Sequence, residues 1–295
     1  MADTKPLGSL DYFKIIAALL VIAIHTSPLT SFNVEADFVL TRIIARTAVP
    51  FFLMVTGYFL LPQYIWGKSM DYRPLFRFIQ KTLLLYAIAI LIFLPVNLYA
   101  GQLENIEAID LIRMLIFDGT FYHLWYLPAS VTGVLILWIL GKKFNFKVLF
   151  IICLVLYGFG LVGDSYYGFT NMFPTVKSLY DTLFHIFSYT RNGIFYVPIF
   201  LVMGAWFGHT PQRRKRIYNI YGFLISLLFM IFEGMTLHIL DVQRHDSMYL
   251  FLLPCMFFLF AAVLSIAKQS PDTGDWELEP IVRIVQRIEH MQMPY

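Results

Sequence analysis

The stretch FVLTRIIARTAVPFFLMVTGYFLL, residues 38–61, is almost entirely apolar, and its only charged residues are Arg42 and Arg46. A helix needs about 20 mostly apolar residues to cross a bilayer, so this stretch predicts a transmembrane helix. A charge at the middle of such a helix costs at least about 2.5 kcal/mol on insertion scales. Because Arg42 and Arg46 are four residues apart, they share one helix face and form a doubly positive site suited to an anionic group. The alternative is that both side chains extend to outer lipid headgroups.

The second half of the same stretch contains Pro50, Thr56 and Gly57. Pro50 predicts a kink, because proline cannot donate a backbone hydrogen bond within the helix. Thr56 and Gly57 are small and allow a neighbouring helix to approach closely. We interpret this half of the stretch as packing rather than chemistry.

The composition of the whole chain agrees with a membrane protein. Of the 295 residues, 59% are hydrophobic and 14% are charged, and the mean hydropathy is +0.68. An ordinary soluble domain carries about 25% charged residues. These values exclude a soluble, a disordered and a nucleic-acid-binding chain. The apolar runs are continuous rather than alternating, which favours helices over a membrane β-barrel.

Eight such segments predict an all-α fold, a polytopic transmembrane helix bundle. They are residues 11–29, 38–61, 78–100, 121–140, 148–163, 193–208, 217–240 and 248–267. Lys and Arg gather in alternate connections, which places both chain ends on the cytoplasmic side. Residues 1–268 are therefore expected to form the transmembrane domain, with 164–192 as an outer loop containing an interfacial or re-entrant helix. Residues 269–295 are expected to form a polar cytoplasmic tail with a short amphipathic helix.

Further polar residues lie within the predicted spans. Lys14 and His25 on the first span are eleven residues apart, close to three helical turns, so they point to the same side. His123 begins the fourth span at the same outer depth as His25. Glu233 lies in the outer half of the seventh span, where a lone carboxylate has to be protonated or paired. Its candidate partners are Arg42, Arg46 and Arg191, and a structural ion pair is the alternative to a catalytic role.

Two outer segments add more polar groups, Thr190-Arg191-Asn192-Gly193 and Gln243-Arg244-His245-Asp246-Ser247. One interpretation is a pair of solvated turns, with a helix cap at Asp246 or Ser247. The other is a polar cavity on the outer side that includes Arg191, Arg244 and His245. Cys153 and Cys255 lie far apart in apolar runs and are expected to be packing residues. The sequence contains no metal-binding motif, so no metal site and no bound cofactor are expected.

At these residues the chain resembles the integral-membrane acyltransferase-3 family. Lys14 and His25 have the spacing of an Arg and a His on that family's first span. Its second-span pattern is similar to Phe51-Phe52 followed by Thr56-Gly57-Tyr58, and its fourth-span histidine motif is similar to Tyr122-His123-Leu124-Trp125-Tyr126. Within the family, the two outer segments most resemble the membrane domain of vancomycin-resistance-type serine/alanine racemases. The resemblance covers residues 8–268, and since the family typically has ten spans, its last spans are expected to be missing here.

The resemblance implies a membrane-bound acyltransferase in a bacterial-type plasma membrane, with acyl-CoA as co-substrate and an envelope or small-molecule acceptor. The group transferred would be other than an amino-acyl group. His25, His123 and Glu233 would then be the catalytic residues, with His25 as general base or transient acyl acceptor. The substrate-binding residues would be Lys14, Arg42, Arg46, Arg191, Arg244 and His245.

Two other functions stay open at this point. The chain could be an amino-acid uptake module that passes serine, with the carboxylate on Arg42 and Arg46 and the ammonium group near Glu233. It could also be an inactive, truncated relative. The expected partners are the lipid bilayer, an acyl donor, and either an envelope acceptor or a small amino acid, and no nucleic acid is expected.

Overall fold

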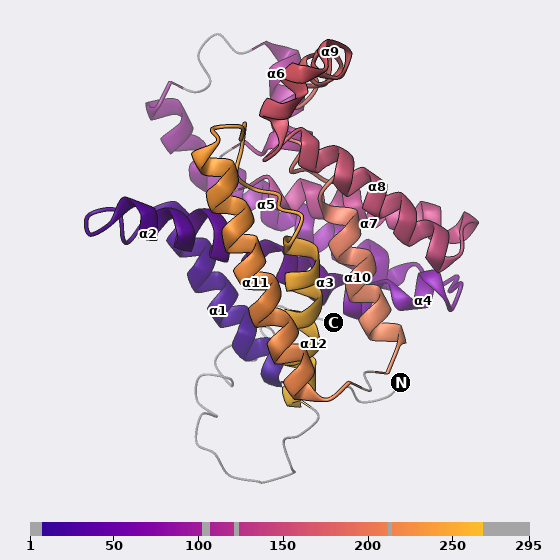
Figure 1. Ribbon diagram of the computed structural model, residues 1–295. Coiled ribbons are helices and arrows are strands. Elements are labelled where there is room, and N and C mark those ends of the chain that lie inside the picture. The colour runs from indigo at the N-terminus through magenta and orange to yellow at the C-terminus, as the bar shows by residue number, and fades with distance from the viewer. Residues whose placement is uncertain (1–7, 102–106, 121–123, 212–213, 268–295) are drawn as a thin grey trace.

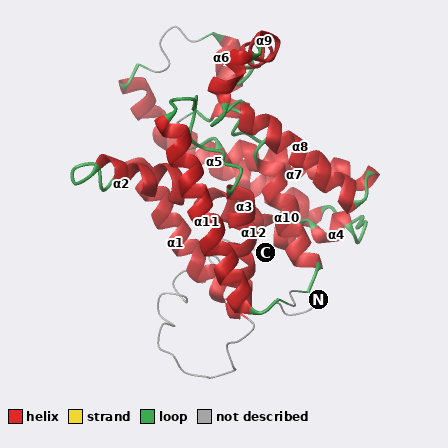
Figure 2. Cartoon of the chain, in the orientation of Figure 1, coloured by secondary structure: helices red, strands yellow, loops and turns green. Residues whose placement is uncertain are grey.

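The structure is a computed structural model, and it describes all residues except 1–7, 102–106, 121–123, 212–213 and 268–295. Helices make up nearly all of the regular structure in these residues (Figures 1 and 2). The helices that correspond to the predicted spans are α1 (Gly8–Thr26), α3 (Ala48–Leu60) with the turns before it, α5 (Arg73–Tyr99), α7 (Tyr126–Lys143), α8 (Phe146–Val162), α10 (Val197–His209), α11 (Arg216–Ile239) and α12 (Leu252–Ala267). The shorter helices are α2 (Val34–Phe38), α4 (Pro62–Ile65), α6 (Ala108–Arg113) and α9 (Pro174–Leu183). The predicted polytopic helix bundle is confirmed.

The helices that correspond to the predicted spans differ in whether they are long and apolar enough to cross a bilayer. Within the described residues, four helical segments are long and apolar enough to do so: Gly8–Thr26, Val34–Leu60, Arg73–Tyr99 and Arg216–Ile239. In contrast, α10 has 13 residues and α12 has 16. At 1.5 Å per residue these helices extend only about 20–24 Å, against a hydrocarbon core of about 30 Å. Both helices are therefore shorter than a full span, and non-helical segments precede each of them.

The second span contains a local break at the two arginines. After α2, the chain forms a π-helical turn at Val39–Ile43 and a 3₁₀ turn at Ile44–Thr47 before α3 begins at Ala48. Arg42 lies in the first turn and Arg46 in the second. The break comes before Pro50 rather than at it, since proline cannot donate to the carbonyl of Arg46, four residues earlier. Such π turns inside helices occur frequently at functional sites.

The core of the bundle is the crossing of α3 and α10 (Figure 1). Ten of the 13 residues of α10 are buried. A Cβ atom at Gly57 would overlap the carbonyl oxygen of Leu201, and one at Gly204 would overlap that of Met54. Glycine at these positions lets the two backbones touch, as predicted for Gly57. By contrast, α1 and α5 lie at the periphery, where only 11% of each span is buried.

The long segment between α8 and α10 forms local structure of its own. It contains a 3₁₀ turn at Tyr167–Met172 and then α9. The carboxylate of Asp181 on α9 accepts hydrogen bonds from the Tyr167 hydroxyl at 2.5 Å and from Lys177 at 3.0 Å. A helix in residues 164–192 was expected, and α9 confirms it.

Candidate functional site

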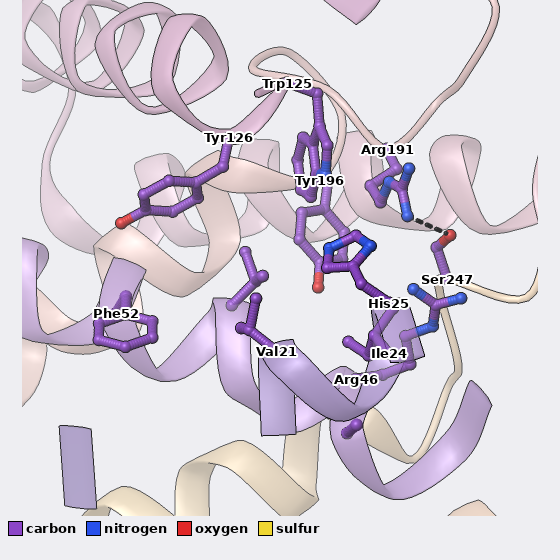
Figure 3. Close-up of a pocket in the computed structure, with 12 residues that line it drawn as sticks. Val21, Ile24, His25, Arg46, Phe52, Trp125, Tyr126, Arg191, Tyr196 and Ser247 are labelled. Carbon is purple, nitrogen blue, oxygen red and sulfur yellow. Dashed lines mark hydrogen bonds between the residues drawn. The ribbon is translucent and has the colours of Figure 1, made fainter. Parts of the chain in front are cut away.

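A cavity of about 290 Å³ lies where the outer ends of several helices meet. Figure 3 shows that its walls come from separate parts of the chain, with His25, Arg46, Arg191 and Ser247 on one side and Phe52 and Tyr126 on the other. The full lining is Val21, Ile24, His25, Ala45, Arg46, Val49, Phe52, Trp125, Tyr126, Arg191, Tyr196 and Ser247. The cavity is thus mostly apolar, with a few polar groups concentrated at one end, as is typical of small-ligand sites.

Arg46 is held by the loop that precedes α12. Its Nε donates to the backbone carbonyl of Asp246 at 2.8 Å, and its Nη2 forms an ion pair with the Asp246 carboxylate. Arg42 approaches the second oxygen of the same carboxylate, with Nη1 3.6 Å from Oδ2. The two arginines therefore share a face, as predicted. The anionic group on them is a side chain of the protein itself.

Arg191 is the second buried cation of the cavity. Its Nη1 donates to the Ser247 hydroxyl at 3.1 Å, and its guanidinium lies 4.6 Å from the ring centroid of Trp125 and 5.2 Å from that of Tyr189. A guanidinium between aromatic rings is in a favourable cation–π arrangement. These contacts fix Arg191 at the cavity wall, which agrees with the interpretation of a polar cavity rather than a solvated turn.

His25 is an exposed residue at the end of α1, and its imidazole points into the cavity in front of the Tyr196 ring (Figure 3). His25 is thus the exposed residue at the polar end of the cavity, whereas Arg46 and Arg191 at the same end are buried. A histidine that faces a cavity can donate a hydrogen bond to a ligand or accept one from it.

The loop before α12 is tied down by Asp164, a carboxylate with no exposed surface. Its Oδ1 accepts hydrogen bonds from the backbone N–H groups of Ser247 at 2.7 Å and Met248 at 2.9 Å, and from the Ser165 hydroxyl at 3.0 Å. Its backbone carbonyl accepts a further bond from the Arg244 N–H at 3.1 Å. Asp164 therefore determines where Asp246 and Ser247 meet the two cavity arginines.

Glu233 holds the next part of the same loop. Its carboxylate accepts hydrogen bonds from the backbone N–H groups of Leu250 at 2.6 Å and Phe251 at 2.9 Å, and from the Tyr166 hydroxyl at 2.7 Å. Among the described residues, no arginine forms an ion pair with Glu233, so the expectation of an arginine partner is wrong. Backbone N–H groups just before α12 bind both carboxylate oxygens instead. Glu233 does not line the cavity, and its catalytic role stays a prediction.

Burial and the neighbouring arginines shift the titration of the loop residues in different directions. Burial raises the pKa of Asp164 to about 6, with Asp246 adding to this effect and the N–H donors and Arg191 opposing it. Burial lowers the pKa of His245 to about 4, and Arg191 and Arg244 lower it further. For Asp246, burial acts to raise the pKa, but Arg46 and Arg42 outweigh it and the net pKa is lowered. Near neutral pH Asp246 is therefore ionised and His245 is neutral, whereas for Asp164 this pH is only about one unit above the pKa.

Three of the predicted substrate-binding residues line a separate outer pocket of about 310 Å³. They are Arg42, Arg244 and His245. Arg244 lies over the ring of Phe184 at 3.6 Å, and His245 packs on Tyr189 with ring centroids 4.4 Å apart. Since Asp246 lines this pocket and Ser247 lines the His25 cavity, the Arg42–Arg46–Asp246 contact lies between the two. The expected single outer cavity is two neighbouring hollows.

The remaining predicted residues lie elsewhere. Lys14 forms an ion pair with Asp11 at 2.8 Å on α1, away from the cavity lining. His123 and the predicted tail helix lie outside the described residues. The expectation of a solvated turn at residues 243–247 is wrong for Ser247, which is 2% exposed.

Sequence reasoning missed Asp164, Trp125 and Tyr196 as parts of the site. Asp164 directly follows the apolar run of α8, and a single acid at that position was the available signal. Trp125 and Tyr196 directly precede α7 and α10, whose sequences are those of ordinary apolar spans. No signal in the sequence therefore distinguishes these two residues from interfacial aromatics.

These features define the class of the protein: a polytopic membrane helix bundle with a small polar-ended cavity among the outer helix ends. Residues 7–284 match the family model described as an acyltransferase domain, and the chain belongs to this acyltransferase-3 family. It is therefore a member of a family of membrane acyltransferases.

Three curated relatives are similar over most of the chain. An amino-acid racemase of Enterococcus faecalis is 44% identical over 268 residues, which are 90% of this chain and 37% of the relative. A serine/alanine racemase of Enterococcus gallinarum is 39% identical over 257 residues, which are 86% of this chain and 37% of the relative. A further amino-acid racemase of Enterococcus faecalis is 38% identical over 262 residues, which are 88% of this chain and 37% of the relative. The chain thus spans little more than a third of the length of these relatives. No solved structure matches the chain.

Proposed function

We propose that this protein is a multi-pass acyltransferase of a bacterial-type plasma membrane. It would move an acyl group from an acyl-CoA-type donor on the cytoplasmic side to an envelope or small-molecule acceptor. Family membership supports the reaction class. The observation that carries the proposal is the cavity that brings His25 to the same small volume as two buried arginines, Arg46 and Arg191.

In this proposal His25 acts as the general base. The imidazole accepts the proton of an acceptor hydroxyl or amine as that group bonds to the carbonyl carbon of the thioester. Negative charge then develops on the carbonyl oxygen, and the nearby guanidinium groups of Arg46 and Arg191 stabilise it. The carbon–sulfur bond breaks, and the proton passes from His25 to the leaving thiolate. The Asp246 carboxylate limits the role of Arg46, so Arg191 is the stronger candidate for this charge.

The donor would approach from the inner side. Lys14 lies on the first half of α1, on a predicted inner end, and its ion pair with Asp11 is partly exposed. A cation there can attract the phosphates of a donor.

The test uses membranes that contain equal amounts of the full chain or of a variant. Membranes are incubated with radiolabelled acetyl-, succinyl- and palmitoyl-CoA, and transfer of label to envelope material is measured. His25→Gln is expected to lower transfer at least about 100-fold, as for loss of a general base. The matched control is His238→Gln, since His238 is exposed and lies in the outer pocket. Equal transfer by His25→Gln and the unaltered chain would contradict the proposal.

A second candidate function is favoured by the names of the relatives, which are racemases of amino acids. In that case the chain binds and passes a small amino acid such as serine. Its carboxylate would bind Arg191 rather than the arginine pair, because Asp246 occupies Arg42 and Arg46. Uptake of labelled serine by vesicles containing the chain, without consumption of acyl-CoA, would favour this function. Absence of uptake by folded protein would count against it.

A further inference from the structure

A groove of about 390 Å³ lies between α8, α10 and α12, apart from the two polar hollows. Both α8 and α12 pack on α10, which forms the floor between them (Figure 1). Every side chain that lines the groove is apolar or aromatic. Ile199 and Met203 on the floor are buried, whereas Leu154 on the rim is 42% exposed. The groove therefore opens outward from the bundle, on the side where a membrane protein meets lipid.

The shape of the groove follows the axis of α8. Phe146, Phe150 and Leu154 line it at intervals of four residues, so they form one stripe that rises about 12 Å along the helix. The opposite wall contains Leu253, Pro254 and Phe257 of α12. An elongated hollow with no polar lining matches a hydrocarbon chain. Left unfilled, its walls would lose dispersion contacts.

Cations stand at one end of this groove. The guanidinium of Arg214 lies 5.5 Å from the ring centroid of Phe257 and 6.0 Å from that of Phe258. Lys147 follows Phe146 in the first turn of α8 and is exposed. Among the described residues, neither cation is within ion-pair distance of a carboxylate. Both lie on connections for which the positive-inside rule predicts the cytoplasmic face, where the leaflet is anionic.

We propose that this groove binds one acyl chain of an anionic phospholipid of the inner leaflet, with the headgroup phosphate between Arg214 and Lys147. The apolar stripe of α8 selects a chain, and the two cations select a negative headgroup. The site does not depend on the proposed acyl transfer, because it lies on the lipid-facing surface of the bundle and shares no lining residue with the His25 cavity.

The proposal is tested by native mass spectrometry of the full chain in detergent, titrated with phosphatidylglycerol or phosphatidylcholine of identical acyl chains. The unaltered chain is expected to retain phosphatidylglycerol more strongly, by about fivefold for each cation. The double variant Arg214→Gln/Lys147→Gln is expected to bind both lipids equally. Arg216→Gln is the matched control for loss of a positive charge, and it is expected to keep the preference.

A second pair of variants tests the chain-binding part. Leu154→Trp fills the rim of the groove and is expected to reduce retention of both lipids. Val155→Trp places the same ring at a residue that is 65% exposed and outside the groove lining, and is expected to change nothing. Equal retention of the two lipids by the unaltered chain would overturn the proposal, as would unchanged retention in folded Leu154→Trp. Displacement of phosphatidylglycerol by lower concentrations of palmitoyl-CoA would assign the groove to an acyl donor instead, and would likewise overturn it.

Discussion

The α3–α10 crossing and residues 247–249 of the loop before α12 are both buried, yet they are held in place in opposite ways. At the crossing, backbones touch at Gly57 and Gly204, and the packing is apolar. In the loop, Asp164 and Glu233 accept hydrogen bonds from four backbone N–H groups that belong to no helix. Regular helices satisfy their own backbone, so they need only close contact. A non-helical buried segment needs hydrogen-bond partners from elsewhere in the chain, and here these partners also position the cavity.

The largest effect is expected at the crossing. Gly204→Ala places a methyl group onto the carbonyl oxygen of Met54, so the helices have to separate. We expect a loss of about 3 kcal/mol or more in the free energy of unfolding, measured as thermal stability in detergent. Gly158→Ala on α8 is the matched control, since nothing lies within 4 Å of a Cβ atom there. If both changes have the same effect, close backbone contact does not hold the crossing.

The next largest effect is expected at Glu233. Glu233→Ala leaves the N–H groups of Leu250 and Phe251 without their acceptor, which should cost about 2–4 kcal/mol. Glu233→Gln retains one acceptor oxygen and should cost less. Hydrogen exchange of the Leu250 and Phe251 amides, together with thermal stability, checks the result. Unchanged amide protection in Glu233→Ala would show that the loop does not depend on this carboxylate.

A smaller effect concerns the dependence of stability on pH. The folded pKa of Asp164, about 6, lies above that of an unfolded carboxyl, so its contribution to stability falls as pH rises from about 4 to 6. The folded pKa of His245, about 4, lies below that of an unfolded imidazole, so its contribution rises with pH from about 4 to 6.5. These opposite slopes offset one another in the unaltered chain.

Single variants should therefore separate the two slopes. As pH rises from 4 to 6, the free energy of unfolding of Asp164→Asn should increase by about 1–2 kcal/mol relative to the unaltered chain. That of His245→Phe should decrease by a similar amount. Phe retains a ring against Tyr189, and Asn retains an acceptor for the loop. Melting curves in detergent at several pH values measure both. The stability of the double variant should depend on pH as weakly as that of the unaltered chain. A strong pH dependence in the double variant would show that the two contributions do not offset one another.

The smallest effect is expected at Arg42. Its side chain is 38% exposed and its nitrogen lies 3.6 Å from Asp246, so Arg42→Gln should cost under about 1 kcal/mol. Arg46 is 6% exposed and binds Asp246 by two groups, so the same change there should cost more. Thermal stability of the two variants gives the comparison. Equal losses would show that burial does not distinguish the two arginines.

The helices could be predicted because long apolar runs leave few alternatives in a membrane. All eight predicted segments have a helix in the described part of the chain, with ends shifted by a few residues. The close contact at Gly57 could be read from a small residue in an apolar run. Gly204, on the other side of the contact, was not predicted, although it lies in the spacing Gly204-x-x-x-Gly208.

The site was less predictable, because its contacts join distant positions. Asp164 and Ser247 are 83 residues apart, and Arg46 and Asp246 are 200 apart. Charge and depth indicated that polar groups gather on the outer side, and His25, Arg46 and Arg191 do line one cavity. Residue types alone could not show that Asp246 forms ion pairs with both arginines or that Glu233 binds backbone groups. Those outcomes depend on the path of a loop that has no periodicity.

The short length of α10 and α12 has an electrical consequence. Arg46, Arg191 and Asp246 lie near one end of these helices, which the positive-inside rule predicts to be the outer end. In that predicted orientation, a membrane potential would fall mainly across the inner part, where the helices are apolar. Each elementary charge carried across the full potential involves about 2.3 kcal/mol per 100 mV. A charged group that reaches His25 from the cytoplasm would therefore traverse most of this field, whereas one that arrives from outside would traverse little of it.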